Sequence, residues 1–504
     1  MKLKSKLGMV TASSMAAIAG IGTGITALVD SPASAAASPN VTIKAVLPPN
    51  TGPITSKQNV ALNRITQQYE KAHPNVKVQW LPNNYTSIVE SNAAIETQAA
   101  GGSAPDVIWE QYNPVLSGSI PNGLLQNLKP YLEKPNPYVA GNKQWIDLYT
   151  KSTVPYMTAP NGTIPIILSS NVETGFFYSK AAFAKAGISS APGTWAALVS
   201  DMAKLKKSGI TPFMFADGSF CNPSWYERLV GTSLLANQIS QFDVDHSIVT
   251  SGLDIVVGVK KGIISMTNPR YAEGWKLLQS ITKYSLSGES SYDACSNPNV
   301  TTPPLGPQSL LIQGKVAMLW GGTWYFPQLD SAGFTNKYGV FPEPVITKAT
   351  TPLALGTKTV GVIGGPNGTG QWSITSQKAD SSMTPQKTAV VMNFMAWLET
   401  PAHVGAWVNG EDLGDIPTEP AAPVLNIPGM KQLVPSKRVP TVVDTMLDSV
   451  IGSAASNSAL RLVQAYVGGS DSWSQFSSAW QSLLTSSANS FAQQNHLNVN
   501  KYLK

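Results

Sequence analysis

A run of aromatic and polar side chains directly follows one predicted strand, which covers residues 106–109. A sugar presents apolar C–H faces, which aromatic rings cover, and many hydroxyls, which carboxylates and amides bind. The residues that end this strand are therefore able to bind an unmodified carbohydrate, and they are Trp109, Glu110, Gln111, Tyr112 and Asn113. The alternative interpretation places Trp109 in the core of its domain.

Further aromatic and small residues stand beside other predicted turns. Asp217 lies in the phrase Phe-Ala-Asp-Gly, where a carboxylate either binds hydroxyls or shapes a turn. For the aromatic members of the group, a core position is the alternative to ligand contact. The remaining candidates are Trp225 and Tyr226 after an Asn-Pro turn, Trp324 with Trp320 and Tyr325 beside it, and Gly364, Gly365 and Trp372 around a Gly/Asn loop.

Catalytic and cofactor chemistry find little support in the sequence. A glycoside hydrolase needs two carboxyl groups across the scissile bond, and only Glu110 and Asp217 are candidates for that pair. The glycine loop at 364–370 lacks the Lys-Ser/Thr of a phosphate loop. The histidines are scattered, so no metal site and no cofactor is predicted; they are His73, His246, His403 and His496.

The elements that must position these residues alternate between strands and helices. Strands are predicted at 41–47 and 76–80, with a helix at 57–72 between them, and this is a βαβ opening. Later helices are predicted after Thr194 and after Asn268-Pro269, where caps and prolines mark helix starts. Residues 439–504 are predicted to be wholly helical. The pattern indicates an α/β fold, and 504 residues suffice for two cores.

Three phrases, in this order, resemble the extracellular solute-binding proteins of carbohydrate ABC transporters (family 1, similar to maltose-binding protein). The first phrase consists of Phe177, Tyr178, Ser179, Lys180, Phe183, Ala186, Gly187, Pro192, Thr194 and Trp195. The second is Leu-x-x-Gly-Lys-x-Ala-Met at 311–318, followed by a Gly-x-Trp turn, and the third is Gly-Val-Phe-Pro at 339–342. Outside the phrases the likeness is loose, and 240–262 and 285–307 resemble insertions.

The resemblance implies a two-lobed periplasmic-binding-protein-like fold of class II, with a central cleft and a multi-strand hinge. Both lobes are then discontinuous. The N-terminal lobe is predicted to comprise residues 40–170 and 372–418, and the C-terminal lobe residues 173–368 and 419–504. Ligands of such folds sit at the carboxyl ends of strands, between the lobes.

The resemblance also assigns expected roles to the candidates above. Residues 109–113 stand where the family places sugar contacts of the first lobe, and Trp324 stands where a ring stacks on the sugar from the second lobe. Trp225 and Tyr226 match another aromatic part of the family's cleft. Gly364, Gly365 and Trp372 flank the second crossing between the lobes.

The function implied is that of an extracytoplasmic component of an ABC importer. A monomer would capture a sugar or oligosaccharide by closing its lobes and deliver it to the permease's transmembrane subunits. It would not be an enzyme. Two other classes stay open: a surface sugar receptor or adhesin feeding a sensor, and a secreted glycoside hydrolase.

The N-terminus predicts export from the cytoplasm. Three lysines precede an uncharged run at 7–29 and the small-residue phrase Ala-Ser-Ala at 33–35, so residues 1–36 are predicted to be a signal peptide. The apolar run could alternatively be retained as a membrane anchor. No cysteine follows the signal, so a lipid anchor is not expected. Export leads to the periplasm or to the outer face of the cytoplasmic membrane.

Charge and cysteine content limit the partners and the environment. Charged residues make up only 13% of the chain, about half the usual share, and the net charge of +6 excludes a strongly basic nucleic-acid surface. A sparsely charged surface suits an acidic exterior, since few carboxylates change charge there. Cys221 and Cys295 are the two cysteines, and in an exported protein they form either a disulfide or two free thiols.

Overall fold

The computed structural model describes most of the chain from Asn40 to Leu503. For Glu110 and Gln111 only the backbone is described. The residues outside the description are 1–39, 49–50, 58, 84–93, 96, 112–122, 152, 160–161, 245–250, 297–302, 356–369, 411–413, 425–428, 434–446, 448–449, 452 and 504. The predicted signal peptide and Tyr112, Asn113, Gly364 and Gly365 lie outside the described residues.

The first sheet has five strands in the order β2-β1-β3-β10-β4. β1 pairs in parallel with β2 and β3, whereas β10 is antiparallel to both of its neighbours. Its strands are β1 (Val41–Val46), β2 (Val76–Leu81), β3 (Val107–Gln111), β10 (Gly370–Ile374) and β4 (Ile166–Ile167). β10 follows β4 by about 200 residues, so this sheet is built from two separate segments of the chain.

The second sheet has four strands in the order β7-β8-β6-β9. β6 pairs antiparallel with β8 and β9, and β7 runs parallel to β8. The strands are β6 (Thr174–Ser179), β7 (Phe213–Met214), β8 (Met318–Gly322) and β9 (Tyr338–Phe341). A small antiparallel ladder joins β5 (Ser170–Asn171) to β11 (Ile416–Pro417). Because β5 lies between β4 and β6 in the sequence, this ladder stands where the chain leaves the first sheet for the second.

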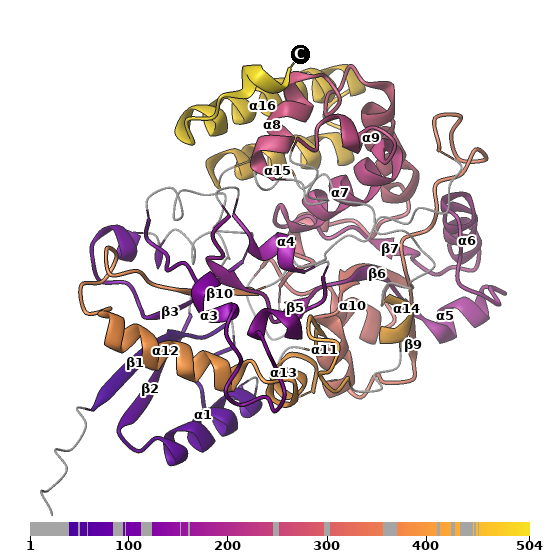
Figure 1. The fold of residues 1–504 in the computed structure, drawn as a ribbon. Helices are drawn as coiled ribbons and strands as arrows, with labels where there is room; N and C mark the ends of the chain where they lie inside the picture. The colour runs from indigo at the N-terminus through magenta and orange to yellow at the C-terminus, as the bar shows by residue number, and fades with distance from the viewer. Residues whose placement is uncertain are drawn as a thin grey trace, which may run out of the picture. The chain divides into compact units, whose positions relative to one another are not determined.

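Helices cover both sheets, and several begin where the sequence predicts. Thr194 and Asn268 cap the helices predicted after them, and Thr384 caps a further one, each by accepting a backbone N–H. Against the first sheet, α1 packs on β2 and α12 on β1 (Figure 1). The helices of the first half are α1 (Val60–Ala72), α3 (Lys129–Leu132), η2 (Trp145–Leu148), α4 (Val154–Met157), α5 (Lys180–Lys185), α6 (Trp195–Lys207) and α7 (Cys221–Leu235).

The C-terminal helices pack beside the middle of the chain. α16 contacts α8, and α15 contacts α9 and α16 (Figure 1). These later helices are η3 (Ile239–Gln241), α8 (Gly252–Lys260), α9 (Pro269–Thr282), η4 (Glu289–Ser291), α10 (Gln308–Ile312), α11 (Tyr325–Ser331), α12 (Pro385–Leu398), α13 (Pro401–Val404), η6 (Gly405–Gly410), α14 (Met430–Leu433), α15 (Ser453–Val467), α16 (Trp473–Gln494) and η8 (Val499–Tyr502). The prediction of a wholly helical end is wrong between α15 and α16, because Gly468 and Gly469 end α15 and Ser472 caps α16.

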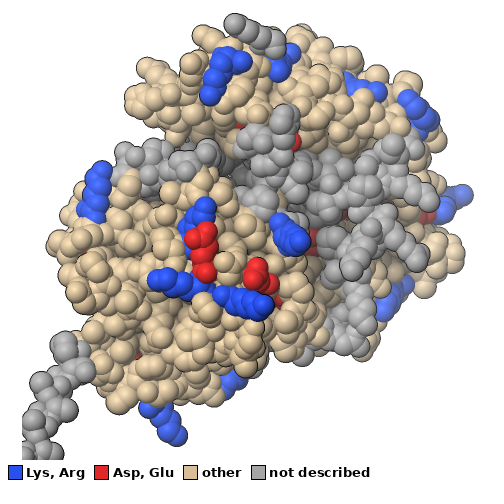
Figure 2. Space-filling view, viewed as in Figure 1, with Lys and Arg blue, Asp and Glu red and all other residues tan. Residues whose placement is uncertain are grey.

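Two large apolar cores lie against the two sheets. The first includes Ile43, Trp109 and Trp372, and the second includes Phe176, Trp225 and Trp480. Charged side chains are sparse on the face shown in Figure 2, as the composition predicts. No helix among the described residues is both long and apolar enough to cross a lipid bilayer.

One buried ion pair ties helix α12 to the residue that precedes β3. The Asp106 carboxylate is fully buried, and its two oxygens accept hydrogen bonds from the Lys387 ammonium at 2.7 Å and from the Lys44 backbone N–H at 2.8 Å. Replacing Lys387 leaves a buried charge without its cation, so Lys387→Met is expected to cost about 2 kcal/mol in unfolding free energy, measured by urea titration. The control is Lys77→Met, which breaks an exposed pair with Glu70 and is expected to cost less than about 1 kcal/mol. Equal losses in the two variants would contradict this assignment.

Candidate functional site

The carboxyl end of β8 presents the best-placed aromatic candidate. Trp324 follows β8 in a turn that leads into α11, and its side chain is partly exposed. A Cβ added at Gly322 would lie 1.9 Å from the Trp324 ring, so only glycine lets the indole lie over this strand end. The turn is anchored by Thr323, whose hydroxyl donates to Asp415 at 2.7 Å.

Two buried tryptophans support Trp324 from behind. The ring of Trp225 lies 6.2 Å from the Trp324 ring and 5.9 Å from the Trp320 ring. Trp225 and Trp320 are 1% and 5% exposed, so Trp324 is the member of this trio that offers a surface to a ligand. The Arg228 guanidinium lies over the Trp225 ring, 4.2 Å from its centre.

The structure places Trp225 and Tyr226 inside the second core, away from solvent. The Tyr226 hydroxyl donates to the Gly274 carbonyl at 2.8 Å, which satisfies it within the protein. Both belong to α7, where most residues are buried. In this arrangement both side chains are core residues, and Trp225 packs against the Trp324 ring.

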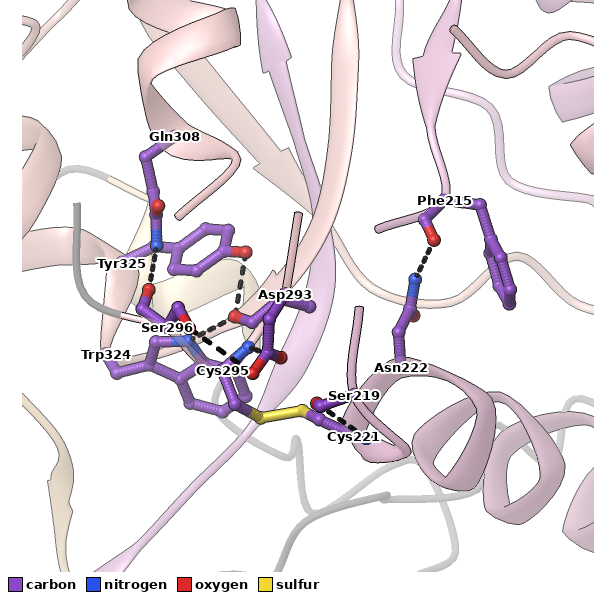
Figure 3. Close-up of a disulfide and its surroundings, with 11 residues drawn as sticks. Phe215, Ser219, Cys221, Asn222, Asp293, Cys295, Ser296, Gln308, Trp324 and Tyr325 are labelled. Carbon is purple, nitrogen blue, oxygen red and sulfur yellow. Dashed lines mark hydrogen bonds between the residues drawn. A yellow bond between two sulfur atoms is a disulfide. The ribbon is translucent and has the colours of Figure 1, made fainter. Parts of the chain in front are cut away.

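A disulfide joins the start of α7 to a neighbouring loop (Figure 3). Cys221 is the first residue of α7, and Cys295 lies 74 residues later. The Ala294 carbonyl beside it accepts hydrogen bonds from the Trp324 indole at 3.1 Å and from the Tyr325 hydroxyl at 2.9 Å. Trp324 is therefore held on one edge by the disulfide-linked loop.

Asp217 follows β7, the strand parallel to β8, and is 3% exposed. Its backbone forms a bridge with Asp293, in the same loop that holds Trp324. The Oδ1 atom has no hydrogen-bond partner among the described residues. Burial, with a smaller contribution from Glu289, raises the pKa of Asp217 to about 7. Near neutral pH such a carboxyl is present in both forms, so it is able to accept a hydrogen bond from a hydroxyl or to donate one to it.

The first-lobe candidates lie on paired strands. Trp109 and Trp372 are opposite one another in β3 and β10, with ring centres 4.6 Å apart, and both are buried in the first core. Glu110 pairs with Gln371 and Gln111 with Gly370, which places their backbones at the carboxyl end of β3. The carboxyl end of β3 therefore lies beside the start of β10. The side chains of Glu110 and Gln111 lie outside the description.

Buried carboxyl groups surround the ladder between β5 and β11, a feature the sequence does not reveal. Asp415 accepts from Thr323 and, at 3.4 Å, from Ser170. Glu343 accepts from Thr174 at 2.6 Å. Burial raises the pKa of Asp415 and of Glu343 to about 7 in each case. Each carboxyl accepts from residues in distant segments, so only the folded chain builds these contacts.

One group of side chains comes close enough together to hold a metal ion. Among the described residues, the atoms grouped closely enough to hold a metal ion come from Cys221, Asp293 and Cys295. Their two sulfurs are bonded to each other and cannot act as thiolate ligands. An aromatic surface with nearby carboxyl and carbonyl groups is typical of a site that binds ring compounds carrying hydroxyls, such as sugars.

Comparison with known proteins settles the fold. Residues 52–244 match the family described as bacterial extracellular solute-binding protein. A solved chitin oligosaccharide binding protein is 18% identical, with a TM-score of 0.66, over 89% of this chain and 99% of that one. The fold is that of a two-lobed solute-binding protein. The resemblance and the α/β fold class predicted from the sequence are thereby confirmed.

Other solved structures share this solute-binding fold. The protein RafE in complex with raffinose is 15% identical, with a TM-score of 0.63, over 89% of this chain and 99% of that one. A probable secreted solute-binding lipoprotein from Streptomyces coelicolor is 14% identical, with a TM-score of 0.61, over 89% and 99%. No curated protein matches the sequence.

Proposed function

We propose that this protein is the extracytoplasmic substrate-binding component of an ABC importer for a mono- or oligosaccharide. The observation that carries the proposal is Trp324, a partly exposed ring at the carboxyl end of a central strand in a solute-binding fold. Solved proteins of this fold include a chitin oligosaccharide binding protein and one in complex with raffinose. Those names support carbohydrate as the substrate class.

The proposed site has one half in each lobe, with the lobe boundaries expected from the sequence. Trp324 and Asp217 belong to the second lobe. Residues 110–113 belong to the first lobe, and Gly364 and Gly365 belong to the second crossing between the lobes. A sugar touching both halves binds best when they close, so binding shifts the population toward the closed state. The closed form is then recognised by the permease. The protein acts outside the cytoplasm, does not alter its ligand and works as a monomer.

A thermal-shift screen tests the substrate class. A ligand that binds the native state raises the melting temperature by mass action. Chitin oligosaccharides, raffinose, maltose and galactose form the first panel, with amino acids, peptides and polyamines as the comparison panel. A shift with a saccharide supports the proposal, whereas shifts with only the comparison panel would reject it. Release of sugar from the oligosaccharides would show a hydrolase instead.

Trp324→Ala is expected to weaken sugar binding about tenfold to a hundredfold, equal to about 1.4–2.8 kcal/mol, because it removes the stacking surface. Isothermal calorimetry with the best saccharide from the screen measures the change. The control is Trp397→Ala, which removes another partly buried indole, in α12 of the first core. Its affinity should stay within about twofold of the native value. Unchanged affinity in Trp324→Ala would remove this residue from the site.

Two measurements distinguish an importer component from a surface receptor or adhesin: whether the N-terminal segment is removed, and whether permease subunits respond to the protein. Intact mass of the exported protein shows whether residues 1–36 are removed. Reconstituted transport with permease subunits, dependent on this protein and its sugar, is the result expected of an importer. Sugar binding without any stimulation of transport would favour a receptor.

A further inference from the structure

A short covalently fastened loop stands between α9 and α10, next to Trp324. We define it as the Cys295 loop, residues 289–296. Its end is joined to the first residue of α7 by the Cys221–Cys295 disulfide (Figure 3). Within the loop, the Cys295 backbone N–H donates to the Asp293 carboxylate at 2.9 Å. The Asp293 N–H donates in turn to the Leu305 carbonyl at 2.9 Å, so the loop is also tied to the chain that follows it.

The Cys295 loop orients Trp324 through one carbonyl. Ala294 precedes Cys295 and is fully buried, and its carbonyl oxygen accepts from both the Trp324 indole and the Tyr325 hydroxyl. The hydrogen bond to Ala294 holds the Trp324 indole to the residue directly before Cys295 (Figure 3). Without this acceptor the indole N–H has no partner among the described residues, and the ring loses the bond that fixes its tilt.

The other end of the disulfide leads to a second contact of the Trp324 ring. Cys221 begins α7, and Trp225 one turn later packs 6.2 Å from the Trp324 ring centre. Asn222 holds the start of the helix to β7 by donating to the Phe215 carbonyl at 2.9 Å. The disulfide therefore connects the two segments that contact Trp324, the helix behind it and the loop at its edge.

We propose that the Cys221–Cys295 disulfide is a positioning device for Trp324, which it holds ready to stack on a sugar. The proposal rests on the proposed function for the identity of the ligand. A ring already held in its bound orientation loses less conformational freedom on binding, so affinity rises without any new contact. A disulfide that only stabilises the fold acts on the unfolded chain and leaves the affinity of the folded protein unchanged.

Affinity separates these two roles. The test variant carries Cys221→Ser and Cys295→Ser, and a second variant carries Cys221→Ala and Cys295→Ala in case the first does not fold. Binding of the best saccharide from the screen is measured by calorimetry, at a temperature where circular dichroism shows every protein to be folded. Positioning predicts a loss of about tenfold in affinity. Native affinity in a folded variant would overturn the proposal.

The matched control lowers stability in the same core without touching the loop. Leu205 is fully buried in α6, and Leu205→Ala leaves a cavity there. Its affinity should remain within about twofold of the native value, although its melting temperature falls. An equal loss of affinity in Leu205→Ala would show that the cysteine variants weaken binding only through stability, which also overturns the proposal.

Hydrogen exchange of the ligand-free protein distinguishes failure of this inference from failure of the sugar assignment. Removing the disulfide should speed exchange of backbone amides at 289–296 and 323–326, and Leu205→Ala should not. Faster exchange in a protein that binds no sugar would reject the proposed function and leave the positioning of Trp324 intact. Unchanged exchange at both segments would reject the positioning role, whatever the protein binds.

Discussion

Lowering the pH from about 8 to about 4.5 is expected to stabilise the protein by about 5 kcal/mol in unfolding free energy. The cause is the group of buried carboxyls beside the ladder of β5 and β11. Burial raises the pKa of Glu343 and of Asp415 to about 7, and burial together with neighbouring Glu343 raises the pKa of Glu173 well above its usual value. The folded state thus keeps protons that the unfolded chain releases near pH 4.

The direction of the effect follows from where each form binds protons. Between about pH 4 and about pH 7 the native state holds more protons than the unfolded state, so stability falls as the pH rises. The full stabilisation is present below about pH 4, where both states are protonated, and it is lost as the pH passes through about 7. A raised pKa of about three units corresponds to about 4 kcal/mol for one independent group. The net effect is smaller than the sum because neighbouring carboxyls share protons.

A second pair of buried carboxyls acts in the same direction. Glu399 accepts from Ser169 at 2.7 Å and is fully buried. Glu419 is 1% exposed, and neither of its carboxyl oxygens has a hydrogen-bond partner among the described residues. Burial raises the pKa of both groups, and the closeness of Glu399 raises that of Glu419 further. The pair favours at least one proton near neutral pH.

Urea unfolding between about pH 4 and about pH 8.5 measures this profile. Glu419→Gln removes one member of the pair while keeping its shape, so it should stabilise the protein near pH 8 and change little near pH 4.5. Glu133→Gln is the control, since this side chain is 52% exposed and should leave the profile unchanged. Stability that is flat or rises with pH would contradict the prediction. A maximum in acid would support the acidic exterior predicted from the low charge content.

Much of the fold could be predicted from the sequence because local signals agree with the final structure. The Thr194 and Asn268-Pro269 helix starts lie within one residue of those predicted. The phrase Leu-x-x-Gly-Lys-x-Ala-Met ends in β8, and Trp324 follows in a partly exposed turn, as the Gly-x-Trp signal predicts. In each case the signal and the element lie within the same short stretch of chain, so no distant contact is needed to decide it.

The rest depends on contacts between distant segments, which a single sequence does not reveal. Trp225 and Trp324 both follow turns and have the same side chain, yet Trp225 is buried by Trp320 and Arg228 while Trp324 keeps an exposed face. The carboxyls beside the ladder give no local signal, since Glu343 and Asp415 lie more than 70 residues apart. Burial of a charged or aromatic residue is decided by what packs over it, and that is settled only when the chain has folded.

Trp372→Ala is expected to cost about 3–5 kcal/mol in unfolding free energy, because it empties the centre of the first core. Trp372 is fully buried in β10, between β3 and β4. Its ring centre lies 4.6 Å from that of Trp109, 5.7 Å from that of Trp407 and 6.0 Å from that of Trp80. A small side chain here would leave three indoles without a shared neighbour.

Substitutions of Trp372 also decide between the two roles that the sequence leaves open for it, a core residue or a ligand contact. If Trp372 is a core residue, Trp372→Phe should recover most of the stability, with a remaining cost of about 1–2 kcal/mol. Sugar affinity should then stay near native in the folded variant. A ligand contact predicts the reverse, a small loss of stability and a large loss of affinity. Urea titration and calorimetry on the same samples measure both quantities. Since an indole enclosed by three others has no face left for a sugar, we expect stability and not affinity to change.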